Sequence, residues 1–272
     1  MITFHLKFYL KTQSLSSKMS KIAKSGLHEE VLVAHDFNTK QQIRSFFNHS
    51  LTSFFRVFEI RNTKTDITDG IINIQVKKST VSFGQIDRVS YSNLKYICKL
   101  SFLENTEQMF KGFIEKEVKD NKCTGSIIKL NTWSSEQQDT FLHDLNIHKE
   151  KLVRHAFEGH IELHIPDYLC SVSYKKSLRH SLSIYKVDNI IKYLLEHNFK
   201  IRPSGTVIQL SDAFTIQRKG GDKQKPSANN VQFKLNIEKL PKDTKDFELL
   251  LVDERSETTE RSETTERSET TE

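Results

Sequence analysis

The stretch TDITDGIINIQVKK, residues 65–78, contains side chains that can bind a metal ion and a phosphate. Asp66 supplies a carboxylate, Gln75 an amide oxygen and Lys77 an ammonium group. Oxygen atoms of this kind are the ligands that Mg²⁺ prefers, and the Val76 backbone carbonyl would add one more. A lysine beside such an ion can face a phosphate and orient or help to deprotonate an attacking water. The stretch therefore predicts a site for Mg²⁺ and phosphate chemistry.

A hairpin must bring these side chains together. Asp-Gly is a strong hairpin signal, so we expect Asp69 and Gly70 to form a two-residue turn. Asp66 would then pair with Asn73 and share one side of the hairpin with the amide and the lysine, because side chains alternate along a strand. The opposite side is apolar, with Ile67, Ile72, Ile74 and Val76. An ordinary half-buried hairpin with solvated lysines is the alternative interpretation.

Two later segments, FTIQRK at 214–219 and VQFKLNI at 231–237, also alternate apolar and polar residues. A basic loop that begins with Gly220 and Gly221 joins them. Lys and Arg suit phosphates or guanine edges, while Gln and Asn suit adenine, so these polar faces are candidates for DNA contact. The candidate residues are Gln217, Arg218, Lys219, Asn229, Gln232 and Lys234. A hairpin with a solvated outer face is again the alternative.

The surrounding elements predict an α/β chain of mixed α+β type. Apolar spacing predicts a helix over 20–35 that carries Glu29 and Glu30, and Thr39 can cap a second helix that ends at Phe47. Further helices are expected over 87–114, 135–145, a stretch that ends near Gly159, and 187–198. Strands are expected at the start of the chain and over 54–60, 160–165, 206–210, 214–219 and 230–237. The order of strands, helices and strands gives no sign of an internal domain break.

Charge and composition favour nucleic acid as a partner. The 272 residues carry a net charge of +6. Three RSETTE copies at 255–272 hold three arginines and six glutamates, a net charge of −3, which leaves +9 for residues 1–254. Excess positive charge attracts phosphates. We expect an N-terminal extension over 1–18, one folded domain over 19–245, and a tail over 246–272 that is disordered because the repeats lack apolar residues.

Other chemistries lack their motifs. The cysteines Cys98, Cys123 and Cys170 lie far apart without a CxxC pair, which argues against zinc or a disulfide framework and favours a cytoplasmic setting. No apolar run approaches the roughly 18 residues of a membrane span, and no signal peptide is evident. HExxH, GxxxxGK[ST] and GxGxxG are all missing, so zinc hydrolysis, nucleotide hydrolysis and dinucleotide chemistry have no support.

Asp66 followed by Gln75-Val76-Lys77 resembles the catalytic motif of the PD-(D/E)XK nuclease superfamily, in the variant where Gln replaces the acidic residue, as in Mrr-type nucleases. Longer stretches resemble a group of type II restriction endonucleases over most of residues 19–240. They are KSGLHEE at 24–30, IQVKKSTVSFGQIDR at 74–88 and FTIQRKGGDKQKPSANNVQFKLN at 214–236. The resemblance implies a restriction-endonuclease-like core, a mixed β-sheet flanked by helices, with Asp66, Gln75 and Lys77 as catalytic residues.

The resemblance also implies an activity and its partners. It implies Mg²⁺-dependent cleavage of both strands of a specific short DNA sequence by a homodimer, with a DNA methyltransferase that protects host DNA. Asp66, Gln75 and Val76 would hold the metal, and Glu29 or Glu30 of the N-terminal helix would approach it. Two alternatives stay open. Because Gln removes one negative charge from the metal shell, the protein could bind DNA and cut weakly or not at all; a methylation-dependent, Mrr-type nuclease would need no partner methyltransferase.

Overall fold

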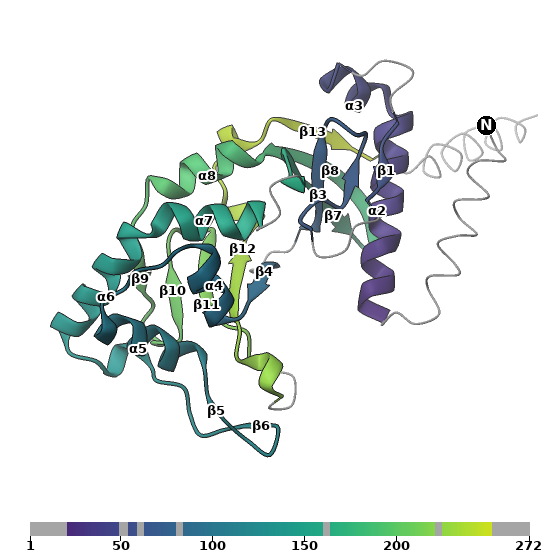
Figure 1. Ribbon diagram of the computed structural model, residues 1–272. Coiled ribbons are helices and arrows are strands. Elements are labelled where there is room, and N and C mark those ends of the chain that lie inside the picture. Colours follow the sequence, from purple (N-terminus) through teal and green to yellow (C-terminus); the bar gives the residue numbers. More distant parts are fainter. Residues whose placement is uncertain are drawn as a thin grey trace, which may run out of the picture.

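The fold is described from a computed structural model (Figure 1). The description covers residues 21–48, 54–58, 63–79, 84–159, 164–220 and 225–251, with the side chains of 21–25 left aside. The expected N-terminal extension and strand, most of the strand expected over 160–165 and the RSETTE repeats lie outside these residues.

A six-stranded mixed sheet, sheet A, contains the strands formed by the stretch TDITDGIINIQVKK, residues 65–78. Its strand order is β1-β2-β3-β7-β8-β13. The strands are β1 (Arg56–Val57), β2 (Ile67–Thr68), β3 (Asn73–Lys78), β7 (Tyr168–Lys175), β8 (Leu178–Lys186) and β13 (Phe247–Leu250). β3 and β7 run parallel, while the other neighbours are antiparallel. The helices α2 (Lys21–Thr39) and α3 (Gln41–Phe46) lie against this sheet (Figure 1).

A second sheet, sheet B, has five antiparallel strands in the order β4-β12-β11-β10-β9. The strands are β4 (Gly84–Val89), β9 (Lys200–Ile201), β10 (Val207–Gln209), β11 (Phe214–Arg218) and β12 (Val231–Leu235). Five helices gather with it in the other half of the molecule (Figure 1), namely α4 (Tyr91–Ile97), α5 (Glu104–Ile114), α6 (Ser135–Ile147), α7 (Lys149–Glu158) and α8 (Val187–Leu195). The remaining elements are the hairpin β5 (Glu117–Lys119) and β6 (Lys122–Thr124), and the 3₁₀ turns Leu130–Thr132, Pro226–Ala228, Ile237–Lys239 and Lys242–Thr244.

Two hydrophobic cores meet at sheet A. One core packs Val33, Phe37 and Ile43 of the N-terminal helices against the sheet. The larger core fills the space between sheet B and its helices. Successive side chains of β7 point to opposite faces of sheet A and so contribute to both cores: Leu169 belongs to the larger core and Cys170 to the smaller. Side chains on the two faces of sheet A therefore have different surroundings.

Several expected elements form for the reasons read from the sequence. Ser134 caps α6 in a reciprocal capping box with Gln137. α7 ends at Gly159, whose φ of +76° suits a glycine. α8 and the strands β10, β11 and β12 of sheet B also lie where predicted, and the expected mixed α/β architecture is confirmed.

Other expectations need correction. Thr39 does not cap α3: Lys40 holds that position, and the Thr39 hydroxyl donates to the His35 carbonyl. The helix expected from Asp87 starts later, because residues 84–89 form β4. The folded domain was expected to end at residue 245, but β13 pairs with β8 beyond that boundary. β7 and β8 were not predicted at all.

In the described part of the chain, each helix is too short or too polar to cross a lipid bilayer.

Candidate functional site

The hairpin that carries the candidate residues has a different register from the one expected. Ile67 pairs with Ile74 and Thr68 with Asn73, a shift of two residues along β3. A shift by two leaves every side chain on its expected face, whereas a shift by one would exchange the faces. Asp66 therefore keeps the same side of the sheet as the amide and the lysine, although its neighbour is no longer Asn73.

The shift arises because the loop is longer than a two-residue turn. The Asp69 carboxylate accepts hydrogen bonds from the amides of Ile71 (2.9 Å) and Ile72 (2.7 Å). The Asp69 amide in turn donates to the Ile72 carbonyl (3.4 Å). Asp69 thus organises the loop, as expected for an aspartate at a turn.

Asp66 is fixed by hydrogen bonds to the residues on either side of Gln75. Its amide donates to the Ile74 carbonyl (2.9 Å), and its Oδ2 accepts from the Val76 amide (2.7 Å). The Lys77 ammonium lies 3.8 Å from the same Oδ2. The structure therefore brings Asp66, Gln75 and Lys77 together at one end of the β2–β3 pair.

Gln75 contains an unusual buried atom. The residue is 2% exposed, and its Oε1 has no hydrogen-bond partner among the described residues. A buried polar atom without a partner costs free energy, on the order of 1–3 kcal/mol. A ligand that accepts the lone pairs of this oxygen, such as a metal ion, would remove that cost.

Glu30 of α2 belongs electrostatically to the same site. Burial raises its pKa to about 7; the Asp66 carboxylate adds to this rise and the Lys77 ammonium opposes it. Burial also raises the pKa of Asp66, while Lys77, the Val76 amide and Lys64 oppose that rise. Water still reaches 22% of the Asp66 side chain, which limits the effect. Two carboxyl groups in one partly buried place favour a bound cation.

Glu29 lies in a different cluster. Its carboxylate is 3.0 Å from Arg179 Nε and 3.7 Å from Lys78 Nζ, and it accepts a hydrogen bond from the Tyr174 hydroxyl. Arg179 also binds Asp36, at 2.7 Å. This corrects the expectation that either glutamate could approach the metal, so only Glu30 is carried into the proposed site.

These groups fit Mg²⁺ better than a softer metal. Within the described ranges, no group of three or more His, Cys, Asp or Glu side chains is placed to hold a metal ion. Mg²⁺ needs fewer protein ligands, because it keeps waters and uses one or two carboxylates together with substrate phosphates. The carboxylates of Asp66 and Glu30 and the unpartnered Gln75 oxygen meet that requirement.

Sheet B presents part of the expected DNA-binding set on one polar face. Gln217 pairs with Gln232 across β11 and β12, while Phe214, Ile216 and Phe233 point into the core. Lys234 shares the polar face through its pairing with Thr215. The Gln232 amide donates to Gln85 Oε1 of β4 at 2.6 Å. The polar face therefore continues from β11 and β12 onto β4.

Arg88 is a basic residue of this face that the sequence analysis missed. It pairs with Gln232 across β4 and β12 and is exposed. Burial and the charge of Arg88 lower the pKa of Lys219, so the two cations repel each other. GQIDRV lacks clean alternation, and helix was expected from Asp87 onward, so the place of Arg88 on this face was not visible from the sequence.

Asn229 has a structural role in place of the expected DNA contact. Its Oδ1 accepts hydrogen bonds from the Lys116 amide (3.0 Å) and from Arg218 Nη2 (2.9 Å), and its Nδ2 donates to the Lys116 carbonyl (2.7 Å). These contacts join the turn before β12 to the start of the β5–β6 hairpin. Arg218 is thereby drawn toward Asn229, which leaves Gln217, Lys219, Gln232 and Lys234 for the polar face.

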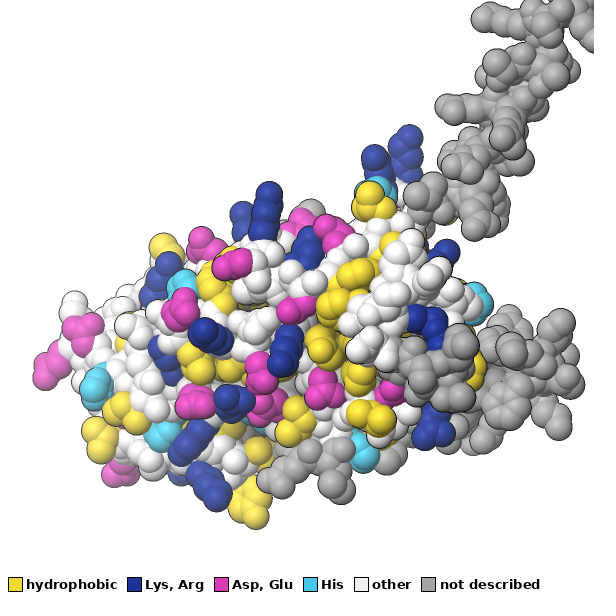
Figure 2. Space-filling view, turned by 90° about the horizontal axis from the view of Figure 1, so that it is seen from above, with side chains coloured by type: hydrophobic (Ala, Val, Ile, Leu, Met, Phe, Trp, Pro, Cys, Tyr) yellow, Lys and Arg dark blue, Asp and Glu magenta, His cyan; other side chains and the backbone are white. Residues whose placement is uncertain are grey.

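The face of the molecule seen in Figure 2 shows no comparable surface. There, the lysines and arginines of the described residues alternate with aspartates and glutamates, and neither sign dominates. A surface that follows a phosphate backbone needs an excess of positive charge. Charge alone therefore does not mark this face as a DNA-binding surface.

Comparison with known proteins identifies the fold of the chain. No family model and no curated protein matches the sequence. The chain has a restriction-endonuclease-like fold, shown by its similarity to a solved structure. That structure is the crystal structure of restriction endonuclease MspI in complex with its cognate DNA, with a TM-score of 0.51 and 11% sequence identity over 77% of this chain and 88% of that one. At this identity the similarity establishes the fold alone.

Proposed function

We propose that the protein is a Mg²⁺-dependent endonuclease that cuts double-stranded DNA at a specific short sequence, as type II restriction endonucleases do. The observation that carries this proposal is the pairing of Asp66 and Lys77, 3.8 Å apart, beside the buried and unpartnered oxygen of Gln75. The restriction-endonuclease-like fold supports it, as does the DNA bound to MspI in the similar structure.

Each residue has a role in hydrolysis under this proposal. Asp66, Glu30, Gln75 and the Val76 carbonyl would hold Mg²⁺, which supplies positive charge to the scissile phosphate and acidifies a water molecule. The Val76 amide fixes the Asp66 carboxylate in place. The Lys77 ammonium faces the phosphate, stabilises the charge that grows on its oxygens and orients the attacking water.

The polar face of sheet B would bind the DNA. Gln217 can form two hydrogen bonds with an adenine edge, while Lys219, Lys234 and Arg88 can bind phosphates or guanine. Gln232 is 8% exposed and its amide is bonded to Gln85, so it supports this face from below. Cutting both strands in a single binding event takes two centres, so we propose a homodimer. A DNA methyltransferase that modifies the same sequence would protect host DNA.

Digestion of plasmid and phage DNA, followed by sequencing of the ends, tests the activity. We expect discrete fragments with one common end sequence when Mg²⁺ is present, and intact DNA when EDTA is added. Because Gln75 stands where the superfamily usually has a carboxylate, a protein that binds DNA without cutting is the second candidate. Intact DNA with every divalent metal, from protein that still binds duplex DNA, would establish that candidate. Cleavage restricted to methylated DNA would indicate a methylation-dependent nuclease.

Substitutions connect that activity to the site. We expect Asp66→Ala and Lys77→Ala to cut at least about 100-fold more slowly while binding duplex DNA, since each removes a group that acts on the reacting phosphate. Asp69→Asn is the matched control, because asparagine keeps the oxygen that accepts the loop amides. Normal cutting by Asp66→Ala together with loss of cutting by Asp69→Asn would place the metal ligand in the loop.

A further inference from the structure

Lys64 links the candidate site to the other sheet. Its ammonium lies 2.5 Å from Asp87 Oδ1 and 3.1 Å from the Ile86 carbonyl, both on β4 of sheet B. The two side chains are 13% and 14% exposed, so this ion pair is well shielded from water. Lys64 precedes Asp66 by two residues in the segment that enters sheet A. One side chain therefore ties the start of β2 to β4.

The end of α7 encloses this ion pair. His155 Nε2 lies 3.2 Å from Asp87 Oδ2, and the imidazole is 4% exposed. Gly159, one turn later, has a φ of +76°, and a Cβ built there would lie 3.0 Å from Lys64 Cγ. Glycine thus supplies both the backbone conformation and the room for the lysine stem. Lys64 is held along its length, by Gly159 at the stem and by Asp87 at the ammonium.

The pair is charged and acts on the candidate site. Burial would raise the pKa of Asp87, but His155 and Lys64 hold it below its ordinary value. Burial lowers the pKa of Lys64, and Asp87 opposes this change; the charges of Lys77 and Asp66 also act on Lys64. Two of the three ammonium donors are already used by Asp87 and Ile86, so Lys64 is suited to hold a position more than to bind a phosphate.

β4 carries Arg88, one of the proposed DNA-binding residues, next to the groups that hold Lys64. Gln85 and Arg88 project onto the polar face, while Ile86 and Asp87 between them hold the ammonium. DNA that presses on or pulls at the polar face would therefore move both acceptors of Lys64. The Thr65 hydroxyl, which donates to the His164 carbonyl at 2.7 Å, restrains the segment between Lys64 and Asp66.

We propose that Lys64 is a positioning residue that couples the seating of DNA on β4 to the placement of Asp66 for cleavage. The inference rests on the proposed function. In this arrangement, the Lys64–Asp87 pair contributes to the rate of the chemical step and contributes little to the affinity for DNA.

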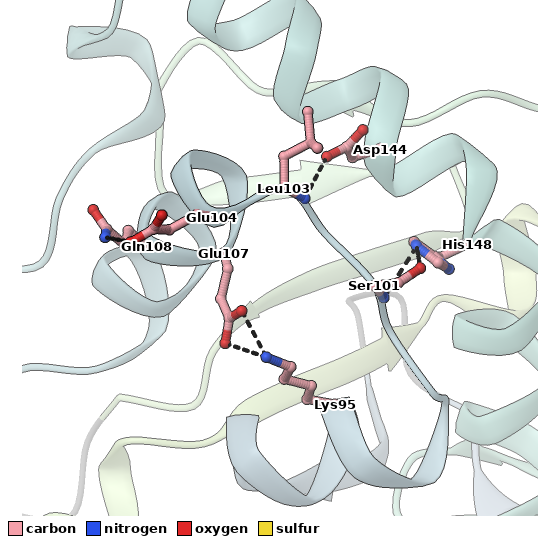
Figure 3. Close-up of polar contacts among 8 residues, drawn as sticks. All are labelled: Lys95, Ser101, Leu103, Glu104, Glu107, Gln108, Asp144 and His148. Atoms are coloured by element: carbon pink, nitrogen blue, oxygen red, sulfur yellow. Dashed lines mark hydrogen bonds and ion pairs between the residues drawn. The ribbon is translucent and has the colours of Figure 1, made fainter.

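Lys64→Met, Asp87→Asn and the double variant test the coupling. Methionine keeps an unbranched stem beside Gly159 and removes the charge. The control is Lys95→Met, which breaks the ion pair between Lys95 of α4 and Glu107 of α5 (2.6 Å, Figure 3) and touches neither Asp66 nor Lys77. The rate of the chemical step is measured by single-turnover cleavage of a plasmid that the unsubstituted protein cuts. The affinity for duplex DNA is measured by binding with Ca²⁺ in place of Mg²⁺. Circular dichroism at the assay temperature verifies folding.

We expect Lys64→Met and Asp87→Asn to slow single-turnover cleavage about 100-fold, the size of effect that a small misplacement of a reacting group produces, with affinity changed less than about threefold. The double variant should be no slower than the slower single variant, because both changes break one coupling. Lys95→Met should leave the rate and the affinity unchanged. The double variant leaves no unpaired charge, so it decides the question if a single variant does not fold.

Cleavage by Lys64→Met within about threefold of the natural rate would overturn the inference, as would an equal fall in rate and affinity or additive losses in the double variant. Failure of the natural protein to cut any DNA would instead refute the proposed function, so the two failures are distinguishable.

Discussion

At the scale of single residues, Gln75 is unusual because its amide oxygen is buried without a hydrogen-bond partner among the described residues. A methionine of similar size would fill the same space without burying an amide. Asp66, Gln75 and Lys77 are neighbours on one face of sheet A, and under the proposed function they bind a cation and a phosphate. The stability lost at Gln75 is consistent with a position kept for binding.

Gln75→Met should make the protein more stable and inactive. Removing the unpartnered buried oxygen of Gln75 should raise the free energy of unfolding by about 1–2 kcal/mol, while loss of the proposed metal ligand should abolish cleavage. The control is Gln232→Met, since the Gln232 amide donates to Gln85 at 2.6 Å. That variant should lose about 1 kcal/mol in urea unfolding. A loss of stability in Gln75→Met would mean that this amide has a partner in the folded protein.

The sequence placed Asp66, Gln75 and Lys77 on one face even though it gave the wrong register. A slip of two residues keeps each side chain on its face, so the prediction tolerated an error in the loop. Glu29 and Glu30 could not be ranked, because adjacent residues of a helix point about 100° apart and only packing fixes the rotation. The structural role of Asn229 was equally hidden, since Lys116 is distant in sequence.

At the scale of elements, Arg179 fixes the rotation of α2 against sheet A. Glu29 and Asp36 lie two helical turns apart on the same side of α2, and both bind the Arg179 guanidinium of β8. Two such contacts resist rolling of the helix. The next residue, Glu30, is thereby directed to the neighbourhood of Asp66 and Lys77.

Arg179→Met should destabilise the protein strongly. The substitution leaves Asp36 buried without its cation and leaves Glu29 with only the more distant Lys78, which should lower the free energy of unfolding by about 3–5 kcal/mol. Arg154→Met is the matched control, because Arg154 pairs with Glu150 and Glu158 on the surface of α7 and is 42% exposed. That change should cost no more than about 1 kcal/mol. Equal losses for the two variants in urea unfolding would contradict the assigned anchoring role.

The elements that the sequence missed are those with a broken apolar pattern. Within GQIDRV, Asp87 points toward the core side, where Lys64 and His155 neutralise it, so the strand does not show clean alternation. β7 and β8 bury serines such as Ser171 and Ser183 on the face that also carries Gln75. Pairing with strands distant in sequence stabilises these polar residues, and such pairing cannot be read from a short stretch of sequence.

At the scale of the whole molecule, the Lys64–Asp87 pair makes the junction of the two sheets sensitive to acid. The folded-state pKa of Asp87 lies below its ordinary value of 3.8. A carboxyl group with a depressed pKa adds stability that is complete above the unfolded pKa and is lost as the pH falls through the folded pKa. The junction should therefore weaken below about pH 4.

Asp87→Asn should lose about 3 kcal/mol at pH 7, because Lys64 is left without its carboxylate. The difference from the natural protein should narrow as the pH falls below about 4, where Asp87 itself becomes protonated. Urea unfolding at pH 7, 5, 4 and 3 measures this difference. Asp139→Asn, at an exposed position of α6, is the control and should follow the natural protein throughout. A difference that stays constant down to pH 3 would contradict the role of Asp87.

Deletion of the RSETTE repeats, residues 255–272, should leave the cut sequence unchanged. β13, the last strand of the described residues, ends at Leu250, before the repeats begin, and the deletion removes a net charge of −3 that repels DNA. Nonspecific binding at low salt should become slightly stronger. Filter binding and the fragment pattern of a plasmid digest measure the two effects, and a new fragment pattern would refute the expectation.

The parallel pairing of β3 with β7 has a consequence for protein synthesis. Asp66, Gln75 and Lys77 leave the ribosome early, but the strand beside them begins only at Tyr168, and the partner of β4 begins only at Val231. Pairings between distant segments form slowly, because a long loop must close first. A nascent chain that has not reached Tyr168 displays the proposed catalytic side chains without the sheet that aligns them. Under the proposed function, unfinished or prematurely terminated chains should therefore leave the DNA around them uncut.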